Sequence, residues 1–307
     1  MPIPNFLLNK LKNEYNEEIT KEILNGFNSK KNTAIRVNNL KTTTNTICNI
    51  LKENNIKYSK ISWFENGLVL EKNSEKILEK LDIYKNGEIY IQNPSSMLPP
   101  ILLDPKCNED ILDMCAAPGG KTTELASLSN NESNITAYEM NKIRAEKLKY
   151  NIEKQGATRI SIIEKDSRKI DNFLSFDKIL LDAPCSGSGT LIEEKDNTNF
   201  TEELINKSIR SQTVLLQKAF RILKKDHILV YSTCSILKEE NENIIKKLLE
   251  NSNNNNNNTK AEIVPIDING RFKDIPKLPT SIDGTLCVKP TDLYEGFFVA
   301  IIRKKSN

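Results

Sequence analysis

The sequence predicts an α/β protein in which a small N-terminal α/β unit precedes a larger, doubly wound parallel sheet. From residue 91 onward, short apolar strands alternate with helical segments of roughly 10 to 15 residues. This order is typical of right-handed βαβ connections, which build parallel sheets with helices on both faces. Residues 1–90 follow a different local pattern. A chain of 307 residues has room for two domains, which we expect at 1–90 and 91–307.

The N-terminal unit is predicted from apolar periodicity and turn residues. Phe6, Leu11 and Ile23 are among the apolar residues that recur at helical spacing in segment 5–28, so we expect a helix there. The elements that should follow are strand 33–38, helix 44–55, and strands 58–64 and 68–70 around a turn at Asn66–Gly67.

The larger unit is predicted strand by strand. We expect strands at 111–114, 135–138, 160–163, 178–181, 228–231 and 297–301. We expect helices at 121–128, 142–155, 201–223 and 239–249. Because six consecutive asparagines occupy positions 253–258, segment 251–259 is predicted to be a flexible insertion within this domain.

Charge and cysteine content narrow the class of protein. The formal net charge is +3, and segment 23–64 holds seven basic residues and one acidic residue. This excess suits a polyanion-binding surface, although a solvated charged face explains it equally well. No segment has the roughly 18 apolar residues of a membrane span or the pattern of a signal peptide. Six cysteines without a CxxC pair and a single histidine predict a cytoplasmic protein with reduced thiols and no metal.

A glycine-rich turn, DMCAAPGGKT at 113–122, joins the first strand of the larger sheet to its helix. Ligands bind at this edge of open α/β sheets, where glycine lets the backbone approach and the helix N-terminus offers free N–H groups. The turn is not a P-loop, because Cys115 stands in place of the first glycine, and it lacks the GxGxxG dinucleotide pattern. A plain helix-start turn is an alternative for this loop alone.

Acidic residues after successive strands favour one cofactor. Asp113 ends the first strand, and Glu139, Asp166 and Asp182 follow the next three. Folding does not explain four acids that crowd negative charge on one edge. A carboxylate after the second strand can accept hydrogen bonds from both ribose hydroxyls of a cofactor. S-adenosylmethionine combines a ribose, an exocyclic amine and a cationic centre, and we expect it as the cofactor.

Two cysteines follow strands at the same edge, Cys185 in DAPCSGSGT (182–190) and Cys234 in YSTCS (231–235). Thiols beside a methyl donor suit methylation of pyrimidine carbon 5, because a thiolate that adds to carbon 6 makes carbon 5 nucleophilic. Asp182 could stabilise the charge that develops on the ring. An amino-nitrogen methyltransferase would carry Asn/Asp-Pro-Pro-aromatic where this chain has Asp-Ala-Pro-Cys. Spacing alone leaves the roles of the two cysteines open.

These motifs resemble the Rsm/Sun (RsmB/NOP/Sun) family of RNA 5-methylcytosine methyltransferases. The likeness includes TAIRVN (33–38), YIQNPSSM (90–97) and EGFFVA (295–300), in the family's order over nearly the whole chain. The start of the chain and QNPSSM are most similar to the bacterial branch that modifies small-subunit ribosomal RNA, and transfer-RNA members share this core. The resemblance implies a Rossmann-like methyltransferase sheet, an RNA-recognition-like N-terminal domain, S-adenosylhomocysteine as a product, and rRNA, or alternatively tRNA, as the partner.

The resemblance also implies a role for each motif residue. The residues that would line the methionine side of the cofactor are Cys115, Ala116, Ala117, Pro118, Gly119, Gly120 and Lys121. Glu139 would hold the ribose, Asp166 the adenine amine, and Asp182 would lie by the methyl donor and the cytosine ring. Cys234 would be the nucleophile, and Cys185 would assist product release. The residues that would contact RNA phosphates are Lys30, Lys31, Arg36 and Lys41.

Some positions depart from the family pattern or lie outside the motifs. Asp226 and His227 replace the usual Gly-Gly, and His227 is expected in a loop. The cysteines expected to be buried structural residues are Cys48, Cys107 and Cys287. The chain ends at Asn307 without the additional C-terminal RNA-binding domain of some ribosomal members. A non-catalytic RNA-binding or ribosome-assembly factor is the alternative function, but the two thiols and four acids favour an enzyme, which we expect to be a monomer.

Overall fold

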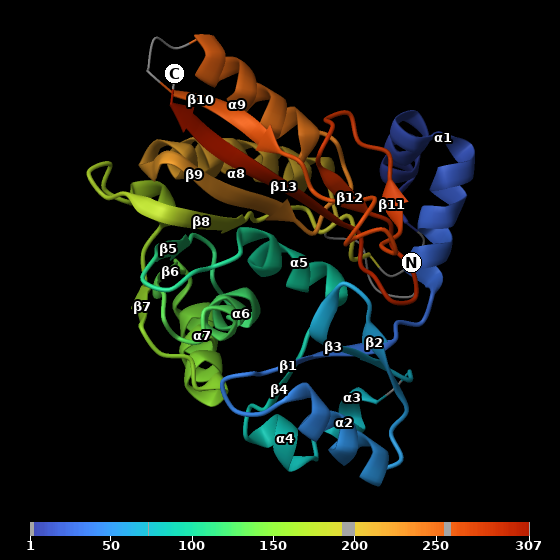
Figure 1. Cartoon of the computed structure of the whole chain (residues 1–307). Coiled ribbons are helices and arrows are strands. Elements are labelled where there is room, and N and C mark those ends of the chain that lie inside the picture. Colours follow the sequence, from blue (N-terminus) through green and yellow to red (C-terminus); the bar gives the residue numbers. More distant parts are fainter. Residues whose placement is uncertain (1–2, 73, 192–199, 255–258, 307) are drawn as a thin grey trace. The chain divides into compact units, whose positions relative to one another are not determined.

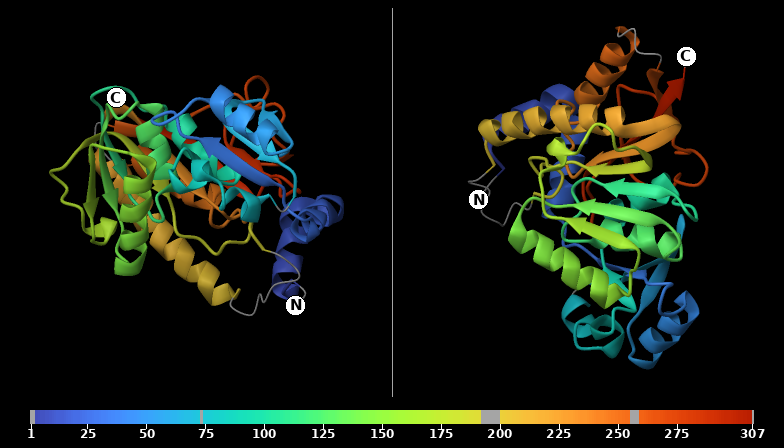
Figure 2. Two further views of the ribbon diagram at one scale, coloured as in Figure 1. Left: turned by 90° about the horizontal axis from the view of Figure 1, so that it is seen from below. Right: turned by 90° about the vertical axis from the view of Figure 1, so that its left-hand side faces the viewer.

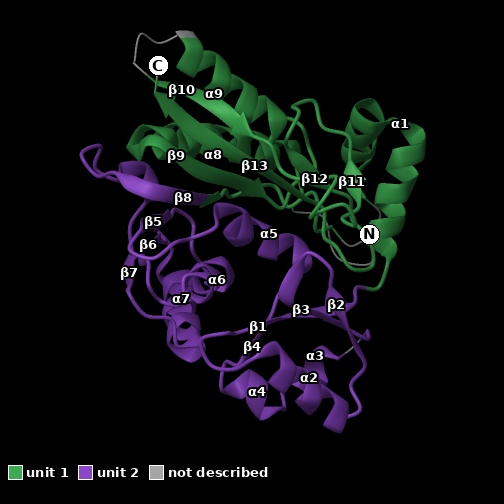
Figure 3. Cartoon of the chain, in the orientation of Figure 1, with its two compact units in different colours: residues 1–30, 181–307 green, residues 31–180 purple. Residues whose placement is uncertain are grey.

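A computed structural model describes residues 3–72, 74–191, 200–254 and 259–306 (Figure 1). The chain divides into two compact units, which Figure 3 colours separately. One unit comprises residues 31–180, and the other joins residues 1–30 to residues 181–307. Because this division follows packing contacts, it leaves the domain boundary expected near residue 90 as a prediction.

The first part of unit 31–180 is a four-stranded antiparallel sheet with strand order β2-β3-β1-β4. Its strands are β1 (Thr33–Val37), β2 (Tyr58–Ile61), β3 (Phe64–Leu70) and β4 (Ile89–Ile91). Its helices are α2 (Thr44–Glu53), α3 (Glu75–Leu78) and α4 (Asp82–Lys85). Ile35, Leu51, Leu68 and Ile89 belong to one buried cluster. Removing these side chains from water stabilises the small domain.

The predicted turn at Asn66–Gly67 is wrong, because both residues lie inside β3. The turn between β2 and β3 consists of Ser62 and Trp63. A Cβ atom on Gly67 would lie 2.8 Å from the side chain of Ile61. The glycine therefore permits close packing within the sheet, a use of strand glycine that the Asn-Gly pair hides in the sequence.

The second part of unit 31–180 contains the predicted parallel strands, in the order β8-β5-β6-β7. These strands are β5 (Asp110–Asp113), β6 (Asn134–Tyr138), β7 (Ile160–Ile163) and β8 (Phe176–Asp182), the last of which continues into the other unit. The helices are α5 (Pro94–Leu103), α6 (Gly120–Leu128) and α7 (Lys142–Gln155), with a short 3-10 turn at Ser167–Lys169. Helices α6 and α7 contact each other beside the strands (Figure 1; Figure 2). The βαβ order confirms the predicted Rossmann-like sheet.

The other unit is built around β13, which pairs antiparallel with β9 on one edge and with β12 and β10 on the other. Its strands are β9 (Leu223–Thr233), β10 (Thr259–Val264), β11 (Lys277–Leu278), β12 (Leu286–Val288) and β13 (Phe297–Ser306). Its helices are α1 (Asn5–Asn28), kinked at Asn16, α8 (Glu202–Ile222) and α9 (Glu242–Asn254). Figure 1 shows α9 beside β10, which it contacts. No helix in the described ranges is long and apolar enough to cross a membrane.

Two features of this unit differ from the sequence prediction. The predicted insertion at 251–259 is too long, because α9 continues to Asn254 and β10 begins at Thr259. Only residues 255–258 fall between them, and they lie outside the described residues. His227 lies within β9 and not in a loop. Asp226 adopts a positive φ of 63°, a conformation that glycine adopts readily, and its carboxylate accepts two hydrogen bonds from Ser306.

Candidate active site

The glycine-rich turn is held in shape by the acid at the end of β5. Asp113 is buried, and its Oδ2 accepts a hydrogen bond from Thr122 Oγ1 at 2.7 Å. Its Oδ1 accepts a long bond from the backbone N–H of Cys115. Gly119, just before α6, has a φ of 109°, which favours glycine. Asp113 therefore joins the start of the loop, at Cys115, to Thr122 in α6, and has a structural role in the loop.

Helix α7 holds the same loop from its outer side. Arg144 Nη2 donates to the carbonyl oxygen of Ala117 at 2.6 Å, and Asn151 Nδ2 donates to that of Pro118 at 2.8 Å. Lys121 lies at the start of α6, where its Nζ donates to Ser96 Oγ at 2.9 Å. Helix α7, through Arg144 and Asn151, and helix α5, through Ser96, thus fix the loop. Its backbone N–H groups are therefore positioned before any ligand binds.

Two of the predicted acids stand directly beyond the next parallel strands. Glu139 is buried, and its carboxylate accepts from the N–H of Asn141 at 2.8 Å and lies 3.3 Å from Arg144 Nη1. Asp166 accepts hydrogen bonds from the Arg168 guanidinium at 2.7–3.0 Å, which lower the pKa of Asp166 below its ordinary value. Arg168, two residues along the chain, is a partner of Asp166 that its motif did not indicate.

The expected phosphate contact by Arg36 is wrong, because Arg36 is only 1% exposed. Its Nε donates to Gln92 Oε1 at 3.1 Å, and its Nη2 donates to Thr123 Oγ1 at 3.0 Å. Its Nε also lies 3.9 Å from Glu124 Oε2. Burial raises the pKa of Glu124 to about 8, against the attraction of Arg36. Arg36 therefore braces helix α6 behind the glycine-rich loop and is not available to RNA.

The other expected phosphate contacts have separate surroundings. Lys30 is exposed, and Lys31 is half-buried. Lys41 is exposed, and its Nζ donates at 2.7 Å to the carbonyl oxygens of Asn86 and Lys154. Lys41 therefore keeps a solvent-facing charge although it is tied to the backbone.

The two predicted cysteines lie together in the other unit, with Cys185 Sγ and Cys234 Sγ 2.9 Å apart. Both are free thiols of intermediate exposure. The hydrogen bond to Cys234 and burial raise the pKa of the Cys185 thiol well above its usual range. Cys185 therefore keeps its proton at neutral pH and can donate it toward the sulfur of Cys234.

Serine residues link the loops that carry these thiols. The hydroxyl groups of Ser188 and Ser235 are 2.7 Å apart, and the N–H of Gly189 donates to the carbonyl oxygen of Cys234 at 3.0 Å. Ser232 Oγ donates to Asp182 Oδ1 at 2.7 Å, which fixes the acid at the end of β8. These serines were not predicted, although they lie within the two cysteine motifs, which was a usable signal.

The three cysteines that were expected to be buried structural residues differ in exposure. Cys48 and Cys287 are buried, as predicted. Cys107 is exposed, so its expected burial is wrong. It lies in a turn that precedes β5, where the chain follows the protein surface. In the described part of the chain, no group of three His, Cys, Asp or Glu side chains is arranged to hold a metal ion.

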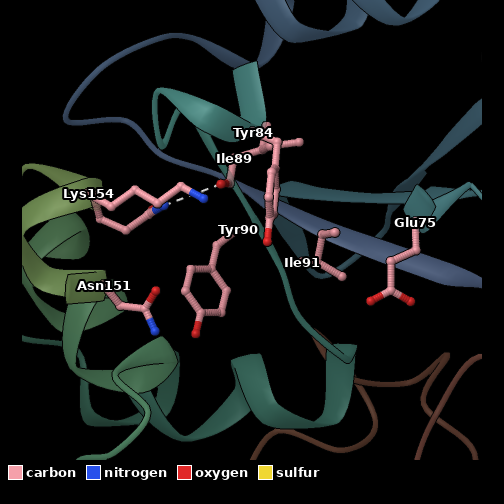
Figure 4. A pocket seen from close by; sticks show the side chains of 8 residues that line it. Glu75, Tyr84, Ile89, Tyr90, Ile91, Asn151 and Lys154 are labelled. Carbon is pink, nitrogen blue, oxygen red and sulfur yellow. Dashed lines mark hydrogen bonds between the residues drawn. The ribbon is translucent and has the colours of Figure 1, made fainter. Parts of the chain in front are cut away.

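A pocket of about 250 Å³ lies on unit 31–180 and was not predicted. It is lined by Glu75, Tyr84, Ile89, Tyr90, Ile91, Asn151, Lys154 and Gln155 (Figure 4). Lys154 Nζ lies 3.7 Å from the centre of the Tyr84 ring. Aromatic faces beside a cation are the groups that stack nucleic-acid bases and contact phosphates.

The parallel sheet, with its glycine-rich turn and acids after the strands, defines the Rossmann-like methyltransferase class. A sequence profile described as 16S rRNA methyltransferase RsmB/F matches residues 100–303. A second profile, described as the ferredoxin-like domain of RsmF/B-like methyltransferases, matches residues 3–75. The chain belongs to the RsmB/F family, as its motifs predict.

Individual relatives agree with this assignment. The Ribosomal RNA small subunit methyltransferase F of Shewanella loihica is 35% identical over 281 residues, which cover 88% of this chain and 56% of the relative. The protein of the same name from Shewanella piezotolerans is 32% identical, with 98% and 64% covered. This chain thus spans less than two thirds of the length of these relatives.

Solved structures agree on the fold. A methyltransferase homolog protein from Pyrococcus horikoshii superimposes with a TM-score of 0.80 at 30% identity, covering 99% of this chain and all of that one. NSun6 from Pyrococcus horikoshii superimposes with a TM-score of 0.84 at 23% identity, covering 98% of both chains. The fold of the described residues is therefore shared by methyltransferases of this type.

Proposed function

We propose that this protein is an S-adenosylmethionine-dependent RNA methyltransferase that modifies carbon 5 of a cytosine in small-subunit ribosomal RNA. The observation that carries the proposal is the pair of thiols 2.9 Å apart, Cys185 and Cys234. Transfer to an amino nitrogen needs no thiol, whereas carbon 5 must be activated by a nucleophile. The names of the relatives favour ribosomal over transfer RNA.

The residues of unit 31–180 suit the cofactor. Glu139 presents a buried carboxylate to the two ribose hydroxyls, and Asp166 can accept from the adenine amine. The backbone of 115–121 would hold the methionine part, with the N-terminus of α6 favouring its carboxylate. When bound, S-adenosylmethionine supplies an electrophilic methyl group and leaves as S-adenosylhomocysteine.

Cys234 is the proposed nucleophile. Its thiolate adds to carbon 6 of the cytosine, which forms an S–C6 bond and moves the C5–C6 electron pair onto carbon 5 and the ring. Asp182, held by Ser232, stabilises the charge on the ring. The two sulfur atoms are close enough for either thiol to donate to the other, and the division of roles follows the resemblance of the two cysteine motifs to the family pattern.

Cys185 is assigned to product release. After carbon 5 is methylated, a base removes the carbon-5 proton, the C5–C6 double bond forms again, and the S–C6 bond breaks to restore the Cys234 thiolate. The distance of 2.9 Å between the two sulfur atoms supports this assignment, because Cys185 would then lie near the bond that must break. Its thiol can hydrogen-bond to the departing thiolate and stabilise the charge on sulfur.

RNA binding is assigned to the N-terminal part. We propose that residues 1–90 form an RNA-binding domain and residues 91–307 the catalytic domain of a cytoplasmic monomer. Lys30, Lys31 and Lys41 would contact phosphates, which give affinity without base identity. The target cytosine must leave its stack, at a cost of about a few kcal/mol.

A methyl-transfer assay tests the proposal. Purified protein is incubated with tritiated S-adenosylmethionine and unmodified 16S rRNA, and the RNA is digested to nucleosides. We expect the label in 5-methylcytidine, and no label with the C185A/C234A double variant. Label in another nucleoside that survives the double substitution would identify an amino-nitrogen enzyme. RNA binding without any transfer would support the alternative of a non-catalytic binding factor.

A further inference from the structure

Glu240 is a fully buried carboxylate that contacts both cysteine loops. It lies in the turn before α9, and its side chain is 0% exposed. Its oxygens accept hydrogen bonds from Ser186 N at 2.7 Å, Ser186 Oγ at 2.5 Å, Ser235 Oγ at 2.6 Å and Gln212 Nε2 at 3.3 Å. Ser186 directly follows Cys185, and Ser235 directly follows Cys234. One carboxylate therefore links the residues next to both thiols.

The partners of Glu240 are neutral donors. In the described part of the chain, no lysine or arginine nitrogen pairs with it within 4 Å. A buried carboxylate costs free energy unless hydrogen bonds compensate it. Here both oxygens are satisfied, so removing the carboxylate would leave donors in both loops without an acceptor.

The backbone around Glu240 is itself fixed. Tyr231 Oη donates to the carbonyl oxygen of Glu240 at 2.6 Å. The side chain of Asn241 accepts from Thr233 Oγ1 at 2.6 Å and donates to the carbonyl oxygen of Ser235 at 2.9 Å. Strand β9 and the Cys234 loop therefore hold the backbone that carries the Glu240 carboxylate in place.

We propose that Glu240 is a positioning residue that holds the two cysteine loops so that their sulfur atoms stay within hydrogen-bond distance. The inference rests on the function proposed above, in which Cys234 adds to the base and Cys185 assists release. Glu240 would touch neither the base nor the cofactor. Its effect would reach the reaction only through the spacing and the protonation of the thiols.

The charge of Glu240 has a second consequence for Cys185. The causes that raise the pKa of Cys185 are, in order, the hydrogen bond to Cys234, burial, the charge of Cys234 and the charge of Glu240. A neutral residue at position 240 should therefore lower the pKa of Cys185. The thiol would then begin to lose its proton at a lower pH than in the wild-type protein.

The test uses Glu240→Gln, with Glu242→Gln as a matched control. Glu242 is also buried and lies two residues further, but it accepts from the N–H of Ser281. For E240Q we expect methyl transfer to rRNA to slow by about tenfold to a hundredfold, because a small misplacement of reacting groups has effects of this size. The dissociation constant for S-adenosylmethionine should not change. E242Q should stay within about twofold of wild type.

A second readout separates positioning from a general loss of structure. The rate of iodoacetamide alkylation at Cys185 is followed by peptide mass spectrometry across pH 6–10. E240Q should shift the profile of Cys185 to lower pH, and E242Q should not. Equal rates and profiles for E240Q and E242Q would overturn the proposal.

Two outcomes need a further comparison. If E240Q does not fold, Ser186→Ala and Ser235→Ala remove single donors to the carboxylate and should slow methyl transfer in the same way, to a smaller extent. If they leave the rate of methyl transfer unchanged, the proposal fails. If the wild-type protein transfers no methyl group, the proposed function is wrong, but the alkylation profiles still decide whether Glu240 controls Cys185.

Discussion

The glycine-rich loop and the cysteine loops are each supported by a buried glutamate. One glutamate lies beside an arginine, whereas the other accepts hydrogen bonds from neutral donors. Glu124, behind the glycine-rich loop, lies 3.9 Å from Arg36 and accepts one hydrogen bond from Gln92 at 3.1 Å. Its Oε1 has no hydrogen-bond partner in the described part of the chain. Both oxygens of Glu240 accept hydrogen bonds from neutral donors.

This difference indicates what each region requires. At the glycine-rich loop, an arginine and a glutamate lock a helix against a small sheet, and burial raises the pKa of Glu124 to about 8 despite the nearby arginine. At the cysteine loops, short hydrogen bonds set the positions of two reactive atoms. We therefore expect the first region to respond mainly in stability and the second mainly in catalysis.

The largest expected effects come from the cysteines. Cys234→Ala should reduce methyl transfer by more than about a thousandfold, because the base can no longer be activated. Cys185→Ala should accumulate a covalent protein–RNA species, seen as a slower band on a denaturing gel. Binding of S-adenosylmethionine should be unchanged in both variants. A covalent species in C234A together with an inactive C185A without one would reverse the two roles.

The next effect concerns Arg36. At pH 9, above the pKa of Glu124, Arg36→Met leaves a buried carboxylate without its cation, so the free energy of unfolding should fall by about 3 kcal/mol. Urea denaturation measures this change. The double variant R36M/E124Q removes both charges and should recover part of the loss. If R36M were as stable as the wild type, the ion pair would not be what holds α6 to the small sheet.

These two regions also show how far the sequence carries the prediction. The parallel strands, the glycine-rich loop and the paired thiols were predictable, because apolar runs and short motifs are local. Arg36 was not, because a charged residue normally indicates the surface and its partner Glu124 lies 88 positions away. Glu240 was hidden within the charged run 238–242, which is typical of a solvated face.

Short antiparallel strands were missed for a different reason. β11 has two residues and β12 has three, so neither is long enough to show an alternating pattern. β12 pairs with an edge of β13, and β11 pairs in turn with β12. Such pairing depends on the tertiary fold and leaves no local trace.

A smaller effect should appear in the pH dependence of stability. The pKa of Glu124 is about 8 in the folded protein and near 4.5 when unfolded, so the folded state binds more protons between these values. Stability should therefore fall as the pH rises from about 4.5 to about 8. Glu124→Gln removes this dependence. The urea midpoint of the variant minus that of the wild type should therefore increase from pH 5 to pH 8. A constant difference between the two proteins would contradict the raised pKa.

The smallest expected effect is on RNA affinity and concerns Lys154, a residue of unit 31–180 that lines the pocket beside Tyr84. Lys154 contacts the rings of Tyr84 and Tyr150, and in the described ranges no carboxylate lies within 4 Å of its Nζ. Lys154→Ala should weaken RNA binding about threefold. The slope of log affinity against log salt concentration should fall in magnitude by about one, as expected for the loss of one phosphate contact. Filter binding at several salt concentrations measures both quantities. Lys207→Ala, at an exposed lysine on α8 outside residues 1–90, is the matched control. If the two variants bind RNA equally well, the pocket beside Tyr84 does not contribute to RNA binding.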